Sequence, residues 1–294
     1  MSEVSDHIRK AFHESDTKRD KGLTTPENIV RYDDIRYAQQ DEMQLLDVYR
    51  PKEMEGQKLP VIFSVHGGAW VYGDKNVYQF YCMQLAQQGF AVVNFTYRLA
   101  PEVKILEQIE DINQVVAWIF EHAKEYLLDT EHIFAVGDSA GAHLLSVYTA
   151  ICTNPAYAKS FSIEVPHGFV PTAIALNCGI YQVYLKDKVD SQTALLMADL
   201  LPKQGTPEEL EWISSINHVT KEYPPVFLMT ATDDFLKMQV LCMQEALLEN
   251  CVPYQMHLYG SATHPLGHVF QCHVRTEDAQ ECNRTECEFF RKFV

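Results

Sequence analysis

The stretch Gly137-Asp138-Ser139-Ala140-Gly141 decides the fold because of what stands on either side of it. Before it runs Ile133-Phe134-Ala135-Val136, a short apolar and partly β-branched run that is typical of a buried strand. After it, residues 142–151 are largely apolar and predict a helix. The sequence therefore predicts a strand that turns sharply into a helix, with a serine at the turn.

A Gly-x-Ser-x-Gly turn in this setting exposes its serine for chemistry. The glycines at 137 and 141 leave room for the strand and the helix to approach each other. The turn lifts the Ser139 hydroxyl above the sheet, at a helix N-terminus whose backbone N–H groups favour developing negative charge. We interpret Ser139 as a nucleophile and Asp138 as a group that orients neighbouring backbone.

A second glycine-rich loop follows an earlier strand. The apolar run Leu59–Val65 predicts a buried strand, and it ends in His66-Gly67-Gly68-Ala69-Trp70. A glycine pair just past a central strand leaves backbone N–H groups free to point into a site. Because the loop precedes a Gly-x-Ser-x-Gly turn, we predict that it helps to form an oxyanion hole.

A serine hydroxyl becomes nucleophilic only beside a general base, and that base needs an orienting carboxylate. The chain supplies the two groups after Ser139, in the order acid and then histidine. We predict Asp234 as the acid and assign the adjacent Asp233 to solvent or to a helix cap. We predict His268 as the base in preference to His264, which precedes a proline.

The same histidines allow a metal hypothesis, since His264, His268 and His273 lie close in sequence with Cys272 beside them. A proline and a glycine interrupt any helix between the first two, so a common face is not guaranteed. We therefore expect neither a metal nor a cofactor.

Strands and helices alternate along most of the chain. With 294 residues, 47% of them hydrophobic, the chain predicts a single α/β domain spanning residues 1–294. The alternation predicts a mostly parallel central sheet with helices on both faces. Residues 1–22 predict an N-terminal helix or tail, and residues from about 178 to 223 predict a small helical cap inserted after a strand.

Composition argues against several partners and locations. The formal net charge of −16 argues against nucleic acid and against anionic membranes. The N-terminus lacks the apolar core of a signal peptide, and no run is long enough to span a bilayer. The eight cysteines are dispersed and predict reduced thiols, so we expect a cytoplasmic protein.

Taken together, these motifs resemble those of the α/β-hydrolase esterases related to hormone-sensitive lipase and the bacterial acetyl esterases. The residues that carry the resemblance stand in the order of that family: residues 66–70, Tyr97-Arg98-Leu99-Ala100-Pro101-Glu102, residues 137–141, Asp234-Phe235-Leu236 and His268. Ala69 stands where the family usually has a third glycine.

The resemblance implies an α/β-hydrolase fold and a cofactor-independent serine carboxylesterase that acts on short-chain, acetyl-type esters. It also implies roles for particular residues: Ser139 as nucleophile, His268 as base and Asp234 as its orienting acid. The implied oxyanion hole consists of backbone N–H groups of Gly68, of Ala69 or Gly67, and of Ala140. We expect Trp70 and Tyr72 to crowd the substrate pocket.

Three alternatives stay open from the sequence. The same motifs occur in amidases, formamidases and peptidases, and the resemblance to acetyl-xylan-type deacetylases is about as good. A non-catalytic binding protein on this fold is the third alternative. The expected partner is a small-molecule ester, and a homodimer is left open because dimers are common in this superfamily.

Overall fold

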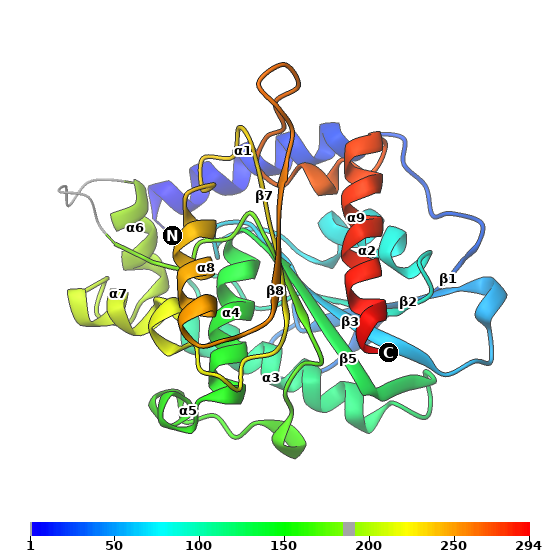
Figure 1. Cartoon of the computed structure of the whole chain (residues 1–294), viewed down its shortest axis with the longest axis horizontal. Helices are drawn as coiled ribbons and strands as arrows, with labels where there is room; N and C mark the ends of the chain where they lie inside the picture. Colours follow the sequence, from blue (N-terminus) through cyan, green and yellow to red (C-terminus); the bar gives the residue numbers. More distant parts are fainter. Residues whose placement is uncertain (1, 185–191) are drawn as a thin grey trace.

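One eight-stranded sheet organises the computed structural model, which describes residues 2–184 and 192–294 (Figure 1). The strand order is β1-β2-β4-β3-β5-β6-β7-β8. The pairs β1/β2 and β2/β4 are antiparallel, and the other five pairs are parallel. The strands are β1 Ile29–Arg36, β2 Leu45–Pro51, β3 Leu59–Val65, β4 Ala91–Phe95, β5 Leu128–Asp138, β6 Ile174–Asn177, β7 Val226–Ala231 and β8 Tyr254–Tyr259.

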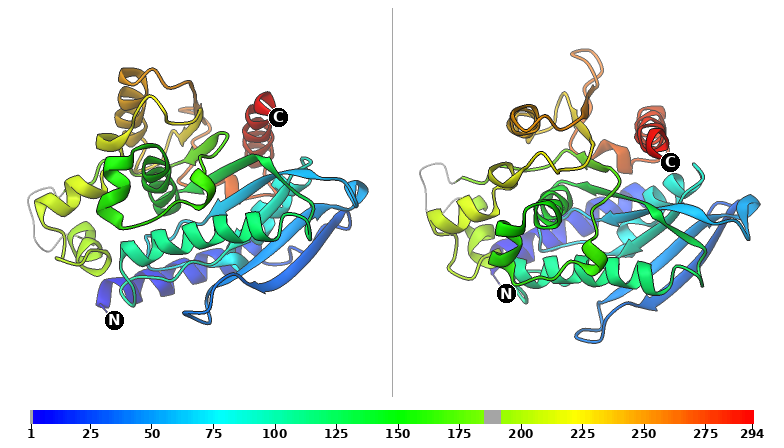
Figure 2. Two further views of the ribbon diagram at one scale, coloured as in Figure 1. Left: turned by 90° about the horizontal axis from the view of Figure 1, so that it is seen from below. Right: turned by 60° about the horizontal axis from the view of Figure 1, so that its bottom comes forward.

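Helices cover both faces of this sheet, as Figure 2 shows. One apolar core joins α3, α4 and α8 to one face, and a second joins α2 and α9 to the other. The described helices are α1 Glu3–Asp20, α2 Lys75–Ala86, α3 Ile105–Glu121, α4 Ala140–Thr153, α5 Pro155–Phe161, α6 Gln192–Leu200, α7 Pro207–Ile213, α8 Gln239–Glu249 and α9 Glu277–Phe290. This arrangement confirms the predicted α/β-hydrolase fold class.

The register of the parallel strands brings their carboxyl ends to one edge of the sheet. Val65 pairs with Gly137, Asp138 with Asn177, and Asn177 with Met229. The loops that follow β3, β5, β6, β7 and β8 therefore meet at this edge, where open α/β sheets place their ligands. Each of the predicted site residues lies in one of these loops or at the turn into α4.

The apolar spacing of Ile105, Ile109, Ile112, Val116 and Ile119 predicts a helix over residues 105–127, but α3 ends at Glu121. His122 already leaves the helical region, with φ −105° and ψ 9°. Leu127 adopts a left-handed φ of 52°, and the Leu128 N–H donates to the carbonyl of Ala123. The apolar spacing of the segment continues past this turn, which is why periodicity alone overestimated the helix length. Helix α5 was not predicted.

The N-terminal segment forms helix α1, which lies against the loop that contains the glycine pair. The Arg9 guanidinium donates to the carbonyls of Val71 and Ala100 and forms an ion pair with Glu102 at 2.6 Å. Near the other end of α1, Arg19 donates to the carbonyl of Val77 at 2.8 Å. Side-chain contacts to the body thus hold this helix at both ends.

The predicted cap insertion contains helices α6 and α7 in its described part. Residues 185–191, which belong to the same predicted segment, lie outside the described residues. The hydroxyls of Ser2, the N-cap of α1, and of Ser5 both donate to the carboxylate of Asp199 on α6. The boundaries of the cap stay a prediction. In the described chain, every helix is too short or too polar to cross a membrane.

Candidate active site

The turn at Ser139 has the backbone conformation that its sequence motif requires. Ser139 joins β5 to α4 with φ 52° and ψ −119°, a region that non-glycine residues rarely adopt. A Cβ atom at Gly141 would lie 2.1 Å from the carbonyl oxygen of Val65, so only glycine fits there. The Ser139 N–H donates to the carbonyl of Asn177 at 2.9 Å, which ties the turn to β6.

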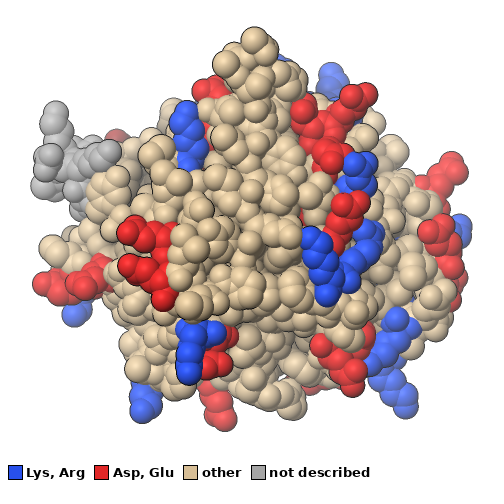
Figure 3. All heavy atoms as spheres, in the orientation of Figure 1, with Lys and Arg blue, Asp and Glu red and all other residues tan. Residues whose placement is uncertain are grey.

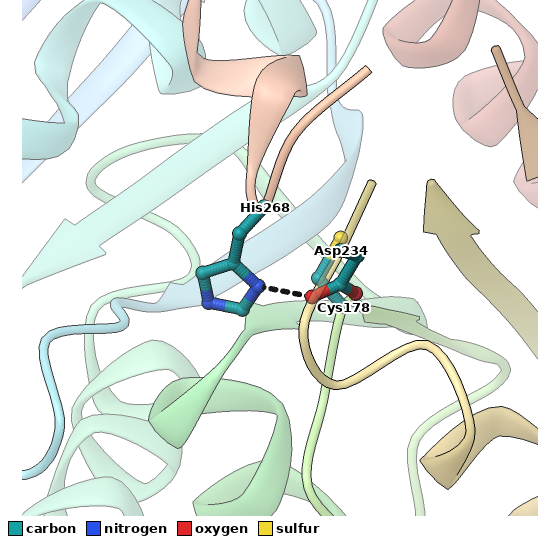
Figure 4. A group of neighbouring side chains, drawn as sticks. All are labelled: Cys178, Asp234 and His268. Atoms are coloured by element: carbon teal, nitrogen blue, oxygen red, sulfur yellow. Dashed lines mark hydrogen bonds and ion pairs between the residues drawn. The ribbon is translucent and has the colours of Figure 1, made fainter. Parts of the chain in front are cut away.

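Three side chains from distant parts of the sequence meet at this turn. His268 Nε2 lies 3.0 Å from Ser139 Oγ, and His268 Nδ1 lies 2.7 Å from Asp234 Oδ1. Figure 4 shows the imidazole of His268 pointing toward the carboxylate of Asp234. With the proton on Nδ1, the imidazole donates to Asp234 and its Nε2 can accept the hydroxyl proton of Ser139.

The carboxylate of Asp234 is fully buried and keeps its charge through hydrogen bonds. Burial by itself raises the pKa of Asp234, but the hydrogen bond and charge of His268, together with two further hydrogen bonds, outweigh it, so the pKa lies below its ordinary value. The Leu236 N–H at 2.9 Å and the Thr230 hydroxyl at 2.8 Å lower the pKa further. Asp234 is therefore ionised at neutral pH and holds the imidazole in one orientation.

The loop after β3 is held under the serine by a buried acid. Asp138 Oδ1 accepts from the Gly67 N–H at 3.1 Å, and its Oδ2 accepts from the Tyr78 hydroxyl at 2.7 Å. Burial raises the pKa of Asp138 to about 6, while the hydrogen bond from Tyr78 opposes that shift. The carboxylate of Asp138 thus orients backbone, in the way its position beside the serine suggested.

This contact corrects one member of the predicted oxyanion hole. The Gly67 N–H is engaged by Asp138 and by the Tyr78 oxygen at 3.0 Å, so it is not available to an oxyanion. Gly68, Ala69 and Ala140 remain as candidate donors. A Cβ atom at Gly68 would lie 2.0 Å from the carbonyl oxygen of Tyr72, and Ala69 takes a left-handed φ of 53°. The loop therefore keeps its tight turn although its third residue is alanine.

A cavity of about 270 Å³ opens over the serine. The residues that line it include Gly68, Ala69, Ser139, Phe235 and His268. Tyr72 lines it, as predicted from the sequence. The cavity has room for a small ester directly above the hydroxyl of Ser139.

Trp70 was predicted to crowd this cavity, and the structure shows that it lies elsewhere. Its side chain is buried in the core, and its indole N–H donates to Nδ1 of His143 at 3.1 Å. Nε2 of that histidine contacts the carbonyl of Ile213 at 2.9 Å. Trp70 follows the loop in sequence, but its left-handed φ of 64° turns the chain inward. It therefore positions the loop and does not line the cavity.

Helix α1 contributes a wall of the cavity, a role that the resemblance to the esterase family leaves open for the N-terminal segment. This wall consists of Phe12, Ser15, Asp16 and Arg19. The Arg19 guanidinium contacts Asp16 at 2.9 Å and Asp20 at 2.6 Å, and the ring of Phe12 packs edge-on against Tyr72 at 5.8 Å. The only sequence signal was a weak apolar stripe, which says that a helix lies on the body but not where.

A cysteine that no motif singled out lies beside the acid. The donor atoms of Cys178, Asp234 and His268 all lie within 4.8 Å of one another (Figure 4). Cys178 is the residue after β6, adopts a left-handed φ of 48°, and is 1% exposed. Burial raises the pKa of its thiol well above the ordinary value, and the carboxylate of Asp234 adds to that shift.

The metal grouping considered from the sequence is a different one. Within the described residues, the cluster of potential ligands that forms contains His268 but neither His264 nor His273. The imidazole of His264 instead pairs with Asp278 on α9 at 2.8 Å and is 65% exposed. These observations favour His268, rather than His264, as the histidine of the site.

The fold and this constellation define an α/β-hydrolase. The chain belongs to the BD-FAE family, whose family model matches residues 46–250. Among curated proteins it is similar to esterase LipC of Mycobacterium tuberculosis, with 30% identity over 202 residues that cover 66% of this chain and 49% of that protein. It is also similar to an acetyl esterase of Salmonella schwarzengrund, at 24% identity, covering 74% of this chain and 69% of that one. The chain spans about half the length of the first curated relatives it matches, 49% and 48%.

Solved structures agree with this assignment over nearly the whole chain. A structure of esterase B from Lactobacillus rhamnosis inhibited by a tributyrin phosphonate superposes with a TM-score of 0.89, at 26% identity, covering all of this chain and 96% of the other. A hyperthermophilic esterase from Pyrobaculum calidifontis superposes with a TM-score of 0.77 at 20% identity, covering 98% and 93%, which shows the shared fold. The predicted resemblance to the esterases related to hormone-sensitive lipase is thereby confirmed.

The contact between Tyr78 and Asp138 gives a prediction about the pH profile. Removing the hydroxyl in Tyr78→Phe takes away a hydrogen bond that opposes the effect of burial and so keeps the pKa of Asp138 from rising above about 6. We expect kcat/KM for p-nitrophenyl acetate to fall on the order of 10- to 100-fold, because the loop that carries Gly68 is displaced. The acid limb of kcat/KM should move to higher pH, since without this hydrogen bond the pKa of Asp138 rises and the carboxylate takes up its proton at a higher pH.

Tyr37→Phe is the matched control, because the Tyr37 hydroxyl is also buried but donates to the carbonyl of Thr96 away from the cavity. Equal losses in the two variants, or an unmoved acid limb in Tyr78→Phe, would contradict the role of Asp138 in holding the loop.

Proposed function

We propose that this protein is a serine carboxylesterase that hydrolyses small-molecule esters with short acyl groups through an acyl-enzyme. The single observation that carries the proposal is the continuous hydrogen-bonded chain from Ser139 Oγ through His268 to the buried carboxylate of Asp234. The esterase names of its relatives support the ester bond as the target.

Acylation begins when Ser139 Oγ attacks the ester carbonyl carbon. The hydroxyl proton passes to His268 Nε2 as the new C–O bond forms. The carbonyl oxygen becomes an oxyanion that the N–H groups of Gly68, Ala69 and Ala140 stabilise, each such donor being worth roughly 10²- to 10³-fold in rate. The protonated imidazole then gives its proton to the leaving alkoxide as the old C–O bond breaks.

Deacylation repeats these steps with water as the nucleophile. His268 Nε2 takes a proton from water, whose oxygen attacks the acyl carbon, and returns the proton to Ser139 Oγ as the acid leaves. Throughout both halves, Asp234 keeps the Nδ1 proton in place and stabilises the imidazolium. No step needs a metal or an organic cofactor.

The preference for short acyl groups is supported by the size of the cavity and by one relative. The cavity of about 270 Å³ is bounded by Tyr72, Phe235 and the α1 wall. The inhibitor in the structure of esterase B is a tributyrin phosphonate, which carries four-carbon acyl chains. We propose that this protein likewise takes chains of about this length or shorter.

The proposed roles predict that each member of the chain is essential while its nearest neighbour of the same type is not. Ser139→Ala, His268→Ala and Asp234→Asn should each lower kcat for p-nitrophenyl acetate by three to six orders of magnitude or so. Asp233→Asn and His264→Ala should change kcat only a few-fold. A fluorophosphonate probe should label the wild type but not Ser139→Ala. Labelled, fully active Ser139→Ala protein would refute the nucleophile.

Acyl-chain length is the second test of the proposal. Across p-nitrophenyl acetate, butyrate and octanoate, kcat/KM should fall by about tenfold or more beyond butyrate, because a longer chain must displace wall residues. Turnover of p-nitroacetanilide, measured alongside, separates an esterase from an amidase. A preference for octanoate would contradict the closed, short-chain pocket.

We also propose that the protein resides in a reducing compartment such as the cytoplasm. The eight cysteines, all within the described residues, are free thiols, which fits that location.

We further propose a homodimer formed through strand β8. Strand β8 is the last in the sheet order, so one of its edges is open in the part of the chain that the structure describes. Figure 3 shows a largely uncharged strip through the middle of this face of the molecule. Met256 and Leu258 on β8 and Leu248 on α8 are exposed, and such an edge is prone to pair with another copy.

In sedimentation velocity experiments, the wild type should behave as a dimer at micromolar concentration, and Leu258→Lys should shift it toward monomer. Leu195→Lys is the matched control, since Leu195 is also exposed but lies on α6. A monomeric wild type would rule out the dimer without affecting the proposed catalysis.

A further inference from the structure

Three potential metal-binding atoms, a sulfur, an oxygen and a nitrogen, lie close together where His268 contacts Asp234. Cys178 offers a sulfur, Asp234 an oxygen and His268 a nitrogen, all within 4.8 Å of one another. They come from the loops after β6, β7 and β8, and Figure 4 shows the sulfur of Cys178 beside the carboxylate that faces the imidazole. The proposed reaction uses Asp234 and His268 but has no task for the thiol.

This donor set suits a borderline-soft divalent cation. Zinc binds thiolate sulfur, imidazole nitrogen and carboxylate oxygen, with the four ligands of a tetrahedral site about 3.5 Å apart. The present distance of 2.7 Å from His268 Nδ1 to Asp234 Oδ1 would have to widen by less than about 1 Å. Magnesium and calcium prefer six or more oxygen ligands, so a set with sulfur and nitrogen disfavours them.

Access to the three donors leads past His268. Cys178 and Asp234 are each 1% exposed, while the side chain of His268 is 20% exposed and lines the cavity. A cation that enters the cavity reaches Cys178 and Asp234 when the imidazole of His268 moves slightly aside. Such a site is better placed to capture a metal that inhibits the enzyme than to hold a permanent structural ion.

We propose that Cys178, Asp234 and His268 form an inhibitory binding site for Zn²⁺ or a cation of similar softness. On binding, the metal takes the lone pair of His268 Nδ1, and the imidazole proton moves to Nε2. The thiol of Cys178 loses its proton to solvent and binds as thiolate. Nε2 then donates instead of accepting, so it can no longer take the proton of Ser139.

The inhibition rests on the proposed catalytic roles, whereas metal binding does not, so the two are measured separately. Binding is tested with Co²⁺ added to Ser139→Ala protein, which should show the near-ultraviolet charge-transfer band of a cobalt–thiolate bond. The band should be absent from the double variant that also carries Cys178→Ser. It should persist in the double variant that carries Cys251→Ser, because Cys251 is an exposed thiol away from the site. A band that survives Cys178→Ser, or no band in the parent protein, would overturn the site.

Inhibition is tested with the wild-type enzyme and p-nitrophenyl acetate. Micromolar ZnCl₂ should inhibit hydrolysis, EDTA should reverse the inhibition, and millimolar MgCl₂ should have no effect. The inhibitory concentration should rise by more than about tenfold in Cys178→Ser and stay unchanged in Cys251→Ser. Equal sensitivity of Cys178→Ser and wild type would refute the proposal.

A binding measurement guards against misfolding of the cysteine variant. If circular dichroism shows that Cys178→Ser does not fold, calorimetry of Zn²⁺ binding to Ser139→Ala with and without Asp234→Asn decides the question. Loss of the carboxylate should weaken Zn²⁺ binding by about tenfold or more. Unchanged affinity would place the metal elsewhere and overturn the inference.

Discussion

The site depends on one buried negative charge, the carboxylate of Asp234. An isolated carboxylate in this position would take up a proton, because burial disfavours the charged form. His268, the Leu236 N–H and the Thr230 hydroxyl all donate to it, and together they hold its pKa below the ordinary value. Since the strongest of these donors is the imidazole Nδ1–H, the charge fixes the tautomer of His268. The fixed tautomer in turn leaves Nε2 free to accept the proton of Ser139.

Backbone contacts join the loop that carries Asp234 to the loop that carries His268. The Asp233 N–H donates to the carbonyl of Leu266 at 2.9 Å, and Asp233 forms a β-bridge with Gly267. The residue before the acid is thus joined to the residues before the base. This explains why two adjacent aspartates stand after β7: Asp234 contributes its side chain to His268, and Asp233 contributes its backbone to the loop that carries His268.

The sequence predicted the parts of this structure that are governed by local pattern. The run Leu59–Val65 is a strand over the predicted residues. The turn at Ser139 requires a glycine at 141, because a Cβ atom has no room there. Each is marked by a short sequence pattern, an apolar run for the strand and Gly-x-Ser-x-Gly for the turn. The order of Ser139, Asp234 and His268 followed from the chain order that this fold imposes on its loops.

Contacts between distant segments could not be predicted in that way. The Gly67 N–H reads as a free donor in the sequence, but Asp138, 71 residues away, accepts it. Trp70 follows the glycine loop, yet its left-handed backbone sends the indole to His143. Helix α3 ends at Glu121, where His122 leaves the helical region, and nothing in the apolar spacing of that segment marks this position.

The family model leaves one wall of the cavity, the one that α1 contributes, outside its bounds. The family model covers residues 46–250, which include Ser139, Asp234 and the glycine loop, but neither His268 nor α1. His268 is still placed by the matched part, because Asp233 joins its loop to β7. Among the described residues, Arg9 and Arg19 hold α1 to the backbone around the glycine loop. Phe12 and Asp16 therefore line the cavity from a helix whose described anchoring contacts are separate from the hydrogen bonds that join the serine, the histidine and the acid.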